Sequence, residues 1–117
     1  MFRVIVAGSR TFNDYGRLER VLNHLLSNTM DDIEIVCGAA RGADALGEQY
    51  ALKQGFSLRY FPAEWERYGR TAGYRRNEQM AEYADALVAF WDGQSKGTRH
   101  MIDLAQKYNL KCRVIRF

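Results

Sequence analysis

The sequence has little cysteine and almost no proline. Two cysteines, Cys37 and Cys112, and one proline, Pro62, occur among 117 residues. So little cysteine excludes a disulfide-rich scaffold, and because each cysteine lies beside an apolar run, we expect two buried, reduced thiols. A single disulfide between them is the alternative.

Long hydrophobic runs and clustered metal ligands are also missing. No apolar stretch approaches the ~20 residues of a membrane-spanning helix, and the first residues do not resemble a signal peptide. We therefore expect a cytoplasmic protein without a membrane partner. The two histidines, His24 and His100, belong to no ligand-spaced cluster, so we expect no metal site and no bound cofactor.

Strong charge of one sign is absent as well. The net charge is only +3, and the excess is local, because residues 67–77 contain four arginines and no carboxylate. Arg67 and Arg70 could simply belong to a solvated surface. The mild charge and the lack of a long basic stripe argue against nucleic acid as the partner.

What the sequence does contain is a regular alternation of strand-like and helical segments. Apolar runs predict strands at 4–7, 33–37, 57–61, 86–91 and 111–117, the last at a sheet edge. Helical periodicity predicts four helices, beginning near Asn13 or Asp14, after Gly42, around Asn77 and near residue 98, with the second ending at Gln54-Gly55.

This alternation predicts an α/β fold of one domain spanning residues 1–117. We expect a Rossmann-like three-layer sandwich with a five-stranded, mainly parallel sheet. Right-handed crossovers leave few topologies, and we favour the strand order 3-2-1-4-5. Residues 63–71 show no clear period and predict one long loop.

Three loops that follow predicted strands have the composition of phosphate-binding loops. They are rich in glycine, hydroxyl and basic residues, the groups that let backbone amides close around an anion. In a parallel sheet these loops share one edge, where open α/β proteins bind ligands. The candidate ligand-binding residues in them are Gly8, Ser9, Arg10, Gly38, Arg41, Gly42, Ala43, Asp44, Asp92, Gly93, Ser95, Lys96, Gly97 and Thr98.

Two features of these loops stay open at the level of sequence. Asp44 falls in a first helical turn, so its carboxylate could cap backbone amides or orient a ribose hydroxyl. The loop at 92–98 lacks the spacing of the nucleoside-triphosphatase loop and predicts an anion cradle without a metal.

Arg75, Arg76 and Asn77 open the third predicted helix. An arginine there can clamp a phosphate in a bidentate way, and Arg76 and Asn77 complete the set of candidate ligand-binding residues. Three aromatic residues of the same region could stack on a base or could anchor the loop to the body; they are Trp65, Tyr68 and Tyr74.

Five ordered blocks of the sequence resemble the SLOG superfamily, which joins the Smf/DprA proteins to the Lonely Guy enzymes. The blocks lie at 6–10, 38–44, 62–65, 72–80 and 89–98, and the similarity is greatest to the YspA-like, cpYpsA-related branch. The resemblance implies a Rossmann-like domain that binds a nucleotide or a nucleotide-derived ligand.

The resemblance to Lonely Guy enzymes is incomplete. Segment 76–80 matches their Arg-Lys-x-x-Met motif, with Arg76 in the arginine position, and Gly97-Thr98 matches part of their glycine-rich loop. The glutamates that should follow are replaced by Arg99, His100 and Met101. Whether this chain is an enzyme is therefore left open.

The sequence thus favours binding of a nucleotide-like small molecule, in the manner of a sensor. The alternatives are a nucleotide-processing hydrolase of the phosphoribohydrolase type, with Asp44 or Asp92 as the carboxylate, and a single-stranded nucleic-acid binder. The resemblance also implies a homodimer or a higher homo-oligomer. Met80, Tyr83 and Met101 could supply an apolar patch for that contact.

Overall fold

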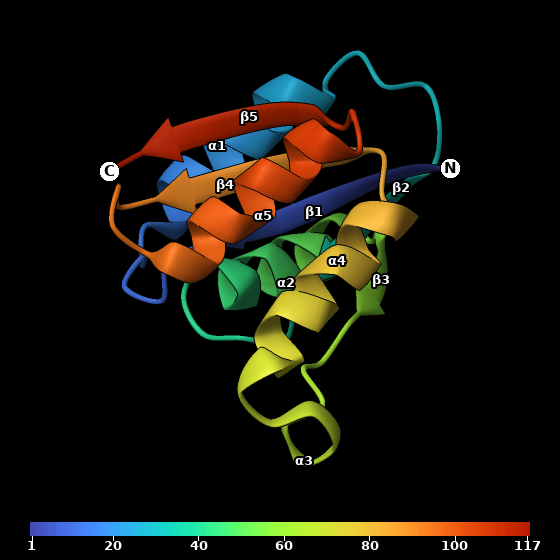
Figure 1. Cartoon of the computed structure of the whole chain (residues 1–117). Helices are drawn as coiled ribbons and strands as arrows, with labels where there is room; N and C mark the ends of the chain where they lie inside the picture. Colours follow the sequence, from blue (N-terminus) through green and yellow to red (C-terminus); the bar gives the residue numbers. More distant parts are fainter.

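The five predicted strands form a single parallel sheet. A computed structural model describes residues 1–117, and in it the strands run in the order β3-β2-β1-β4-β5 (Figure 1). Every neighbouring pair is parallel, so the predicted α/β fold and the predicted strand order are both confirmed. The strands are β1 (Phe2–Gly8), β2 (Ile33–Cys37), β3 (Ser57–Tyr60), β4 (Ala86–Trp91) and β5 (Lys111–Arg116).

Helices cover both faces of this sheet. From β1 the chain moves outward through β2 to β3, and it then returns to the other side of β1 for β4 and β5. Right-handed crossovers in opposite directions place their helices on opposite faces. One face therefore carries α1 (Tyr15–Leu26) and α2 (Ala43–Gln54), and the other carries α4 (Ala72–Tyr83) and α5 (Lys96–Lys107).

The ends of the first two helices follow from single residues. Asp14 caps α1, because its carboxylate accepts a hydrogen bond from the Arg17 backbone N–H at 3.0 Å. Gly55 ends α2 in the left-handed conformation, with φ of 73°, which a residue without a Cβ adopts at little cost. Both boundaries agree with the sequence-based prediction.

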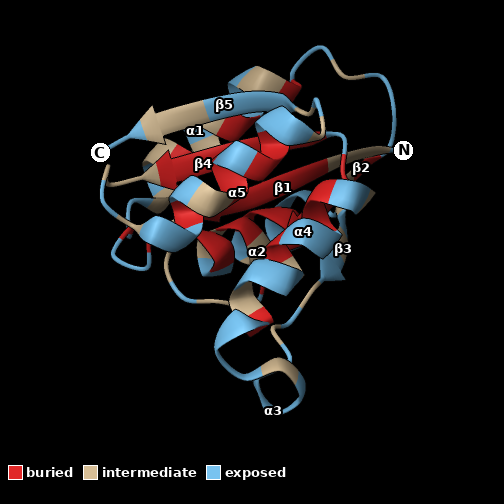
Figure 2. Ribbon diagram, in the orientation of Figure 1, coloured by how far each residue is buried: buried red, intermediate tan, exposed pale blue.

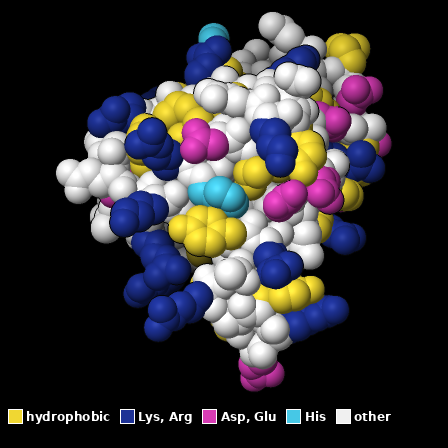
Figure 3. Space-filling model, viewed as in Figure 1, with side chains coloured by type: hydrophobic (Ala, Val, Ile, Leu, Met, Phe, Trp, Pro, Cys, Tyr) yellow, Lys and Arg dark blue, Asp and Glu magenta, His cyan; other side chains and the backbone are white.

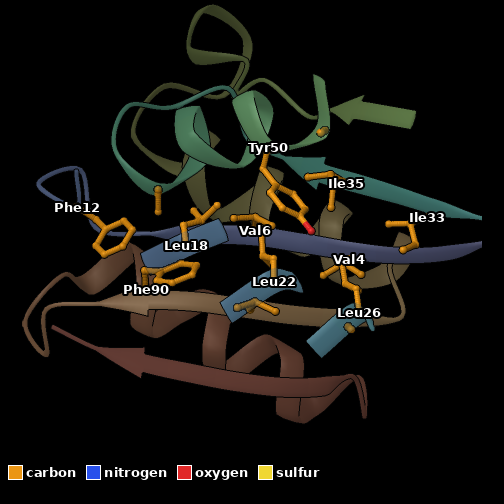
Figure 4. Packing of buried hydrophobic residues seen from close by; sticks show 14 residues of the cluster. Val4, Val6, Phe12, Leu18, Leu22, Leu26, Ile33, Ile35, Tyr50 and Phe90 are labelled. Carbon is orange, nitrogen blue, oxygen red and sulfur yellow. The ribbon is translucent and has the colours of Figure 1, made fainter. Parts of the chain in front are cut away.

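The core consists of two apolar layers separated by the sheet. One layer lies between the sheet and α1 and α2, where Val4, Val6, Leu22 and Tyr50 are fully buried (Figure 4). The second layer lies against α4 and α5 and includes Ile5, Met80 and Met101. Figure 2 shows the same pattern, with buried residues concentrated in β1 and β4 and exposed residues along β5.

Three expectations about local structure are wrong. Segment 63–71 is helical rather than a plain loop, because it contains α3 (Trp65–Tyr68) and the 3-10 turn η1 (Gly69–Thr71); elements of three or four residues are too short to display a period. Two long helices begin earlier than predicted: the third at Ala72, three residues before Arg75, and the fourth at Lys96, two residues before the predicted start. Cys112 is exposed, because the edge strand β5 is covered less completely than the central strands.

The predicted apolar patch for a partner is also wrong. Met80 and Met101 are each only 1% exposed and belong to the core against α4 and α5. Helical spacing of methionines fits a core face as well as an interaction face. No helix of the chain has both the length and the apolar character required to cross a bilayer.

Candidate functional site

The carboxyl ends of β1, β2 and β4 meet at one edge of the sheet and surround a small hollow. This inner hollow has a volume of about 110 Å³, and its floor includes the buried residues Ala7, Met80 and Met101. Its walls come from the strand ends and the loops that follow them, from the second turn of α4 and from the first turn of α5. The wall residues are Gly8, Arg10, Ala40, Asp44, Arg76, Asn77, Ser95, Gly97 and Thr98.

Two further hollows adjoin the inner one and share lining residues with it. The β2-side hollow, about 340 Å³, extends over the loop that follows β2. The α4-side hollow, about 230 Å³, extends over the start of α4. Arg10 and Arg76 line all three hollows, so we treat the three as one crevice centred on these two arginines.

Arg76, in the second turn of α4, is held by the protein on two sides. Its Nη1 donates to the Gly38 carbonyl at 2.6 Å, and its Nε donates to the Asn77 side-chain oxygen at 3.0 Å. Burial lowers the pKa of Arg76 and the nearby carboxylate of Asp44 opposes that shift; the guanidinium stays charged at neutral pH. Two of its five N–H groups donate to the protein, and the other three have no acceptor within the chain.

Asn77 connects Arg76 to α5. Its side chain is 7% exposed, and its Oδ1 accepts from Arg76, so its Nδ2 must donate. That nitrogen lies 3.3 Å from the Gly97 carbonyl and 3.2 Å from His100 Nδ1. All of the amide is thereby used inside the protein, and it positions the guanidinium relative to the first turn of α5.

Asp44 closes the loop after β2 upon itself. Its carboxylate is almost fully buried and accepts a hydrogen bond from the Gly38 N–H at 3.0 Å. Burial raises the pKa of Asp44, while Arg76 and the N–H groups of Gly38 and Ala40 act in the lowering direction. The amides of this loop are therefore directed at a carboxylate of the protein itself.

The loop after β4 leaves its helix end open. Asp92 Oδ1 accepts from the Gln94 and Ser95 N–H groups, both at 2.8 Å, and these bonds lower the pKa of Asp92. The first hydrogen bond of α5 is donated by the Arg99 N–H to the Ser95 carbonyl. The N–H groups of residues 96–98 therefore have no acceptor in the helix. They carry the positive end of the α5 dipole.

The loops after β1, β2 and β4 are locked together behind the crevice. Ser9 Oγ accepts from the Asp92 N–H at 3.1 Å, and the Ser9 carbonyl accepts from Ala43 N–H at 3.4 Å. Gly42 has φ of 72°, and a Cβ there would lie 2.4 Å from the Ser9 carbonyl oxygen. Gly8 has no space either, since a Cβ would lie 2.2 Å from the Phe90 carbonyl oxygen.

The structure brings most of the sequence-predicted residues into the crevice. Those that line the inner hollow are Gly8, Arg10, Asp44, Arg76, Asn77, Ser95, Gly97 and Thr98, and Gly38 and Arg41 line the β2-side hollow. The remaining predicted residues line none of the three hollows; they are Ser9, Gly42, Ala43, Asp92, Gly93 and Lys96. Most of these join loops to one another or pack against other parts of the chain.

The crevice also contains residues that the predicted set omits. Trp65 and Arg70 line the outer hollows together with Tyr74. The two aromatic residues carried a signal in the sequence, because both lie near Arg76 in a polar segment. Arg70 carried none, since an isolated arginine is equally consistent with a solvated surface.

The fold and the site define a Rossmann-like α/β domain with a polar crevice at the carboxyl ends of its central strands, and comparison with known proteins identifies its family. The family model of the YspA, cpYpsA-related SLOG family matches residues 2–68. The chain belongs to this family, as the resemblance predicted. It is also 36% identical over 113 residues to the Gene 61 protein of Mycobacterium phage D29, which covers 92% of this chain and 90% of that protein.

Two solved structures share the fold. DNA processing protein A from Streptococcus pneumoniae superposes with a TM-score of 0.74 at 17% identity, covering 99% of this chain and 50% of that one. The corresponding protein from Helicobacter pylori gives a TM-score of 0.69 at 18% identity, covering 97% and 64%. The chain thus spans less than two thirds of either protein.

One expectation about partners is wrong. The structure from Helicobacter pylori is described for its single-stranded DNA binding mode, so this fold does not argue against nucleic acid. The net charge was a poor guide because it is a sum over the whole chain, whereas four arginines line the crevice: Arg10, Arg41, Arg70 and Arg76. Figure 3 shows several lysine and arginine side chains gathered at the lower left, with others spread over the rest of this face.

Proposed function

We propose that the crevice binds the phosphate group of a nucleotide, either free or as part of a nucleic acid. The observation that carries this proposal is the meeting of Arg76 and the first turn of α5 at one hollow of about 110 Å³. A phosphate in that hollow would accept hydrogen bonds from the guanidinium and from the unpaired amides of α5. Charge-assisted bonds of this type are the strong ones in proteins.

Gly97 supports access of a ligand to these amides. A Cβ built at this position would meet no atom within 4 Å, so the glycine is not required by packing. It leaves the backbone of α5 uncovered where the inner and the α4-side hollows meet. A ligand oxygen can therefore approach the helix end closely.

The geometry favours binding over hydrolysis. Asp92 lines none of the hollows, and its Oδ1 is used by two amides of its own loop. Asp44 is then the one carboxylate that lines the inner hollow, and it also holds the Gly38 N–H. Hydrolysis of a glycosidic bond commonly uses two carboxyl groups.

The homodimer stays a prediction, now without the apolar patch that supported it.

Binding measurements on phosphorylated and unphosphorylated ligands test the proposal. Isothermal titration with a nucleoside 5′-monophosphate, a 5′-phosphorylated oligothymidylate and the matching nucleoside should show that affinity requires the phosphate. Arg76→Ala should weaken binding about thirtyfold, equivalent to ~2 kcal/mol for a lost charge-assisted contact. The first two ligands also distinguish a free nucleotide from a strand.

Arg67→Ala is the matched control. Arg67 is exposed, and its Nη1 lies 3.8 Å from Glu64 Oε2. It lines none of the three hollows, so Arg67→Ala should leave the affinity unchanged. Circular dichroism of both variants checks that the fold persists. Unchanged affinity in a folded Arg76→Ala variant would contradict the proposal.

A further inference from the structure

The outer crevice has two aromatic side chains at its edges. Trp65 and Tyr74 are 56% and 48% exposed, although aromatic rings of this size usually bury most of their surface. The Trp65 ring lies beside Gly73 of α4, where a Cβ would be 3.6 Å from its Cη2, and the Tyr74 ring packs edge-on against His100 with centroids 4.6 Å apart. Both rings are open to solvent at the edge of the crevice.

Trp65 lies between the two outer hollows. It is the one aromatic residue that lines both the β2-side and the α4-side hollow, and the other two shared residues are Arg10 and Arg76. Tyr74 lines only the α4-side hollow. One indole at the boundary of two adjoining hollows offers stacking surface to two flat rings rather than to one.

The charges around these hollows fit more than one phosphate. No carboxylate lines either outer hollow. Arg10, Arg41 and Arg70 are exposed and form no ion pair within the chain. Arg75, by contrast, donates to Thr71 Oγ1 at 3.1 Å and lies over the Tyr68 ring. A mononucleotide would leave most of the free arginines without an anion.

The hollows offer few groups that could distinguish one base from another. The β2-side hollow contains no amide, hydroxyl or carboxylate side chain. In the α4-side hollow the amide of Asn77 is already used by Arg76, Gly97 and His100. Recognition of ring faces and phosphates without base edges is typical of sequence-tolerant binding to single strands.

We propose that Trp65 and Tyr74 form two neighbouring base-stacking subsites, and that the ligand is a single-stranded nucleic-acid segment of at least two nucleotides. The inference rests on the proposed phosphate site and specifies its ligand. The terminal phosphate occupies the inner hollow beside Arg76. One base stacks in each outer hollow, and the free arginines contact the phosphates that follow.

A length series tests this inference. The 5′-phosphorylated oligothymidylates of one to four nucleotides would be titrated by calorimetry and by tryptophan fluorescence. Because stacking on an aromatic side chain contributes substantially per base, the dinucleotide should bind about tenfold more tightly than the mononucleotide. The same titration of Trp65→Phe gives the fluorescence change of the other tryptophan, Trp91. The difference from the wild type is the contribution of Trp65.

Variants of the aromatic residues test which side chain accounts for the higher affinity of the dinucleotide. Trp65→Leu should remove most of the difference between mononucleotide and dinucleotide, and Tyr74→Leu should reduce it. Tyr68→Leu is the matched control, because Tyr68 belongs to α3 like Trp65 but lines none of the three hollows. Replacing thymine by adenine or cytosine should change affinity by less than about threefold.

The outcomes separate this inference from the proposed function. Equal affinity for one and two nucleotides, with binding still lost in Arg76→Ala, overturns the inference and leaves the phosphate site standing. Tighter binding of a pyrophosphate-linked dinucleotide than of the phosphodiester dinucleotide overturns the assignment to a strand. Absence of binding at every length overturns both proposals.

Discussion

The loops after β2 and β4 look alike in sequence and behave differently in the structure. Each follows a buried strand and leads into a 12-residue helix. Each also has two glycines between the strand and the end of the first helical turn, Gly38 and Gly42 in one and Gly93 and Gly97 in the other. In the first loop, Asp44 accepts the Gly38 N–H, and Ala43 N–H donates to the Ser9 carbonyl. In the second, the amides that begin α5 remain unpaired beside Gly97. The first loop is closed up to the start of its helix, whereas in the second loop Asp92 binds only the Gln94 and Ser95 N–H groups and the helix end stays open.

This difference assigns separate tasks to two similar segments. The closed loop fixes the position of Arg76, whose Nη1 donates to the Gly38 carbonyl. The open loop presents backbone donors to the same hollow. A glycine-rich composition therefore indicates a tight backbone, and it does not by itself indicate a bound phosphate. Whether backbone amides are available to a phosphate depends on whether a side chain of the protein already accepts their hydrogen bonds.

The largest effect on stability should come from the closed loop. Gly42→Ala introduces a Cβ 2.4 Å from the Ser9 carbonyl oxygen, at a residue with φ of 72°. Steric overlap and backbone strain together should lower the free energy of unfolding by ~3 kcal/mol or more. Urea denaturation measures it. Gly55→Ala, with a similar φ but no neighbouring atom within 4 Å, isolates the strain, and an equal loss in both variants would contradict the packing argument.

A second comparison uses pH. Burial raises the pKa of Asp44, so the folded chain binds this proton more readily than the unfolded chain, and the stability contributed by Asp44 falls as pH rises above about 4. The Ser95 and Gln94 amides lower the pKa of Asp92, so its contribution is present above about pH 4 and is lost on acidification. The two loops should therefore depend on pH in opposite directions.

Urea midpoints of Asp44→Asn, Asp92→Asn and the wild type between about pH 3 and 7 measure this difference. Relative to the wild type, Asp44→Asn should gain stability as the pH rises. Asp92→Asn should lose stability relative to the wild type over the same range. Parallel profiles for the two variants would show that the carboxylates have equivalent surroundings.

The smallest effect on stability should come from the open loop. Gly97→Ala places a methyl group where no atom lies within 4 Å, and alanine is a better helix former than glycine. The free energy of unfolding should rise by ~0.5 kcal/mol. Affinity for a nucleoside monophosphate should nevertheless fall, because the methyl group covers the α5 amides. Urea denaturation measures the free energy of unfolding, and calorimetry measures the affinity. Unchanged affinity would show that the phosphate does not bind at the α5 amides.

The sheet could be predicted from the sequence because strand-length segments rich in apolar residues alternate with helical segments. The order of the strands was favoured by the handedness of the crossovers, and the edge position of β5 followed from its charged residues Arg113 and Arg116. Short elements could not be predicted in this way. The four residues of α3 give no period, and methionines at helical spacing occupy a core as readily as a surface.

The candidate site was predictable in its location but not in its detailed roles. The convergence of Gly8, Asp44 and Thr98 at one hollow follows from parallel strands. The sequence could not show that the Asp44 carboxylate turns back to the Gly38 amide, because that depends on a side-chain conformation. The position of Trp65 between two hollows depends on α3, which the sequence-based prediction treated as loop.

The position of β1 in the middle of the sheet has a consequence for folding kinetics. Val4 pairs with Ile35 on one side and with Ala86 on the other. The second pairing joins residues far apart in the chain, and non-local parallel pairings slow the search for the folded state. Ser9, directly after β1, depends on the same distant segment, because its Oγ accepts from the Asp92 N–H. Because β4 follows β1, β2 and β3 in the chain, one edge of β1 has no native partner until β4 has been synthesised, and an unpaired strand edge is prone to misassociation.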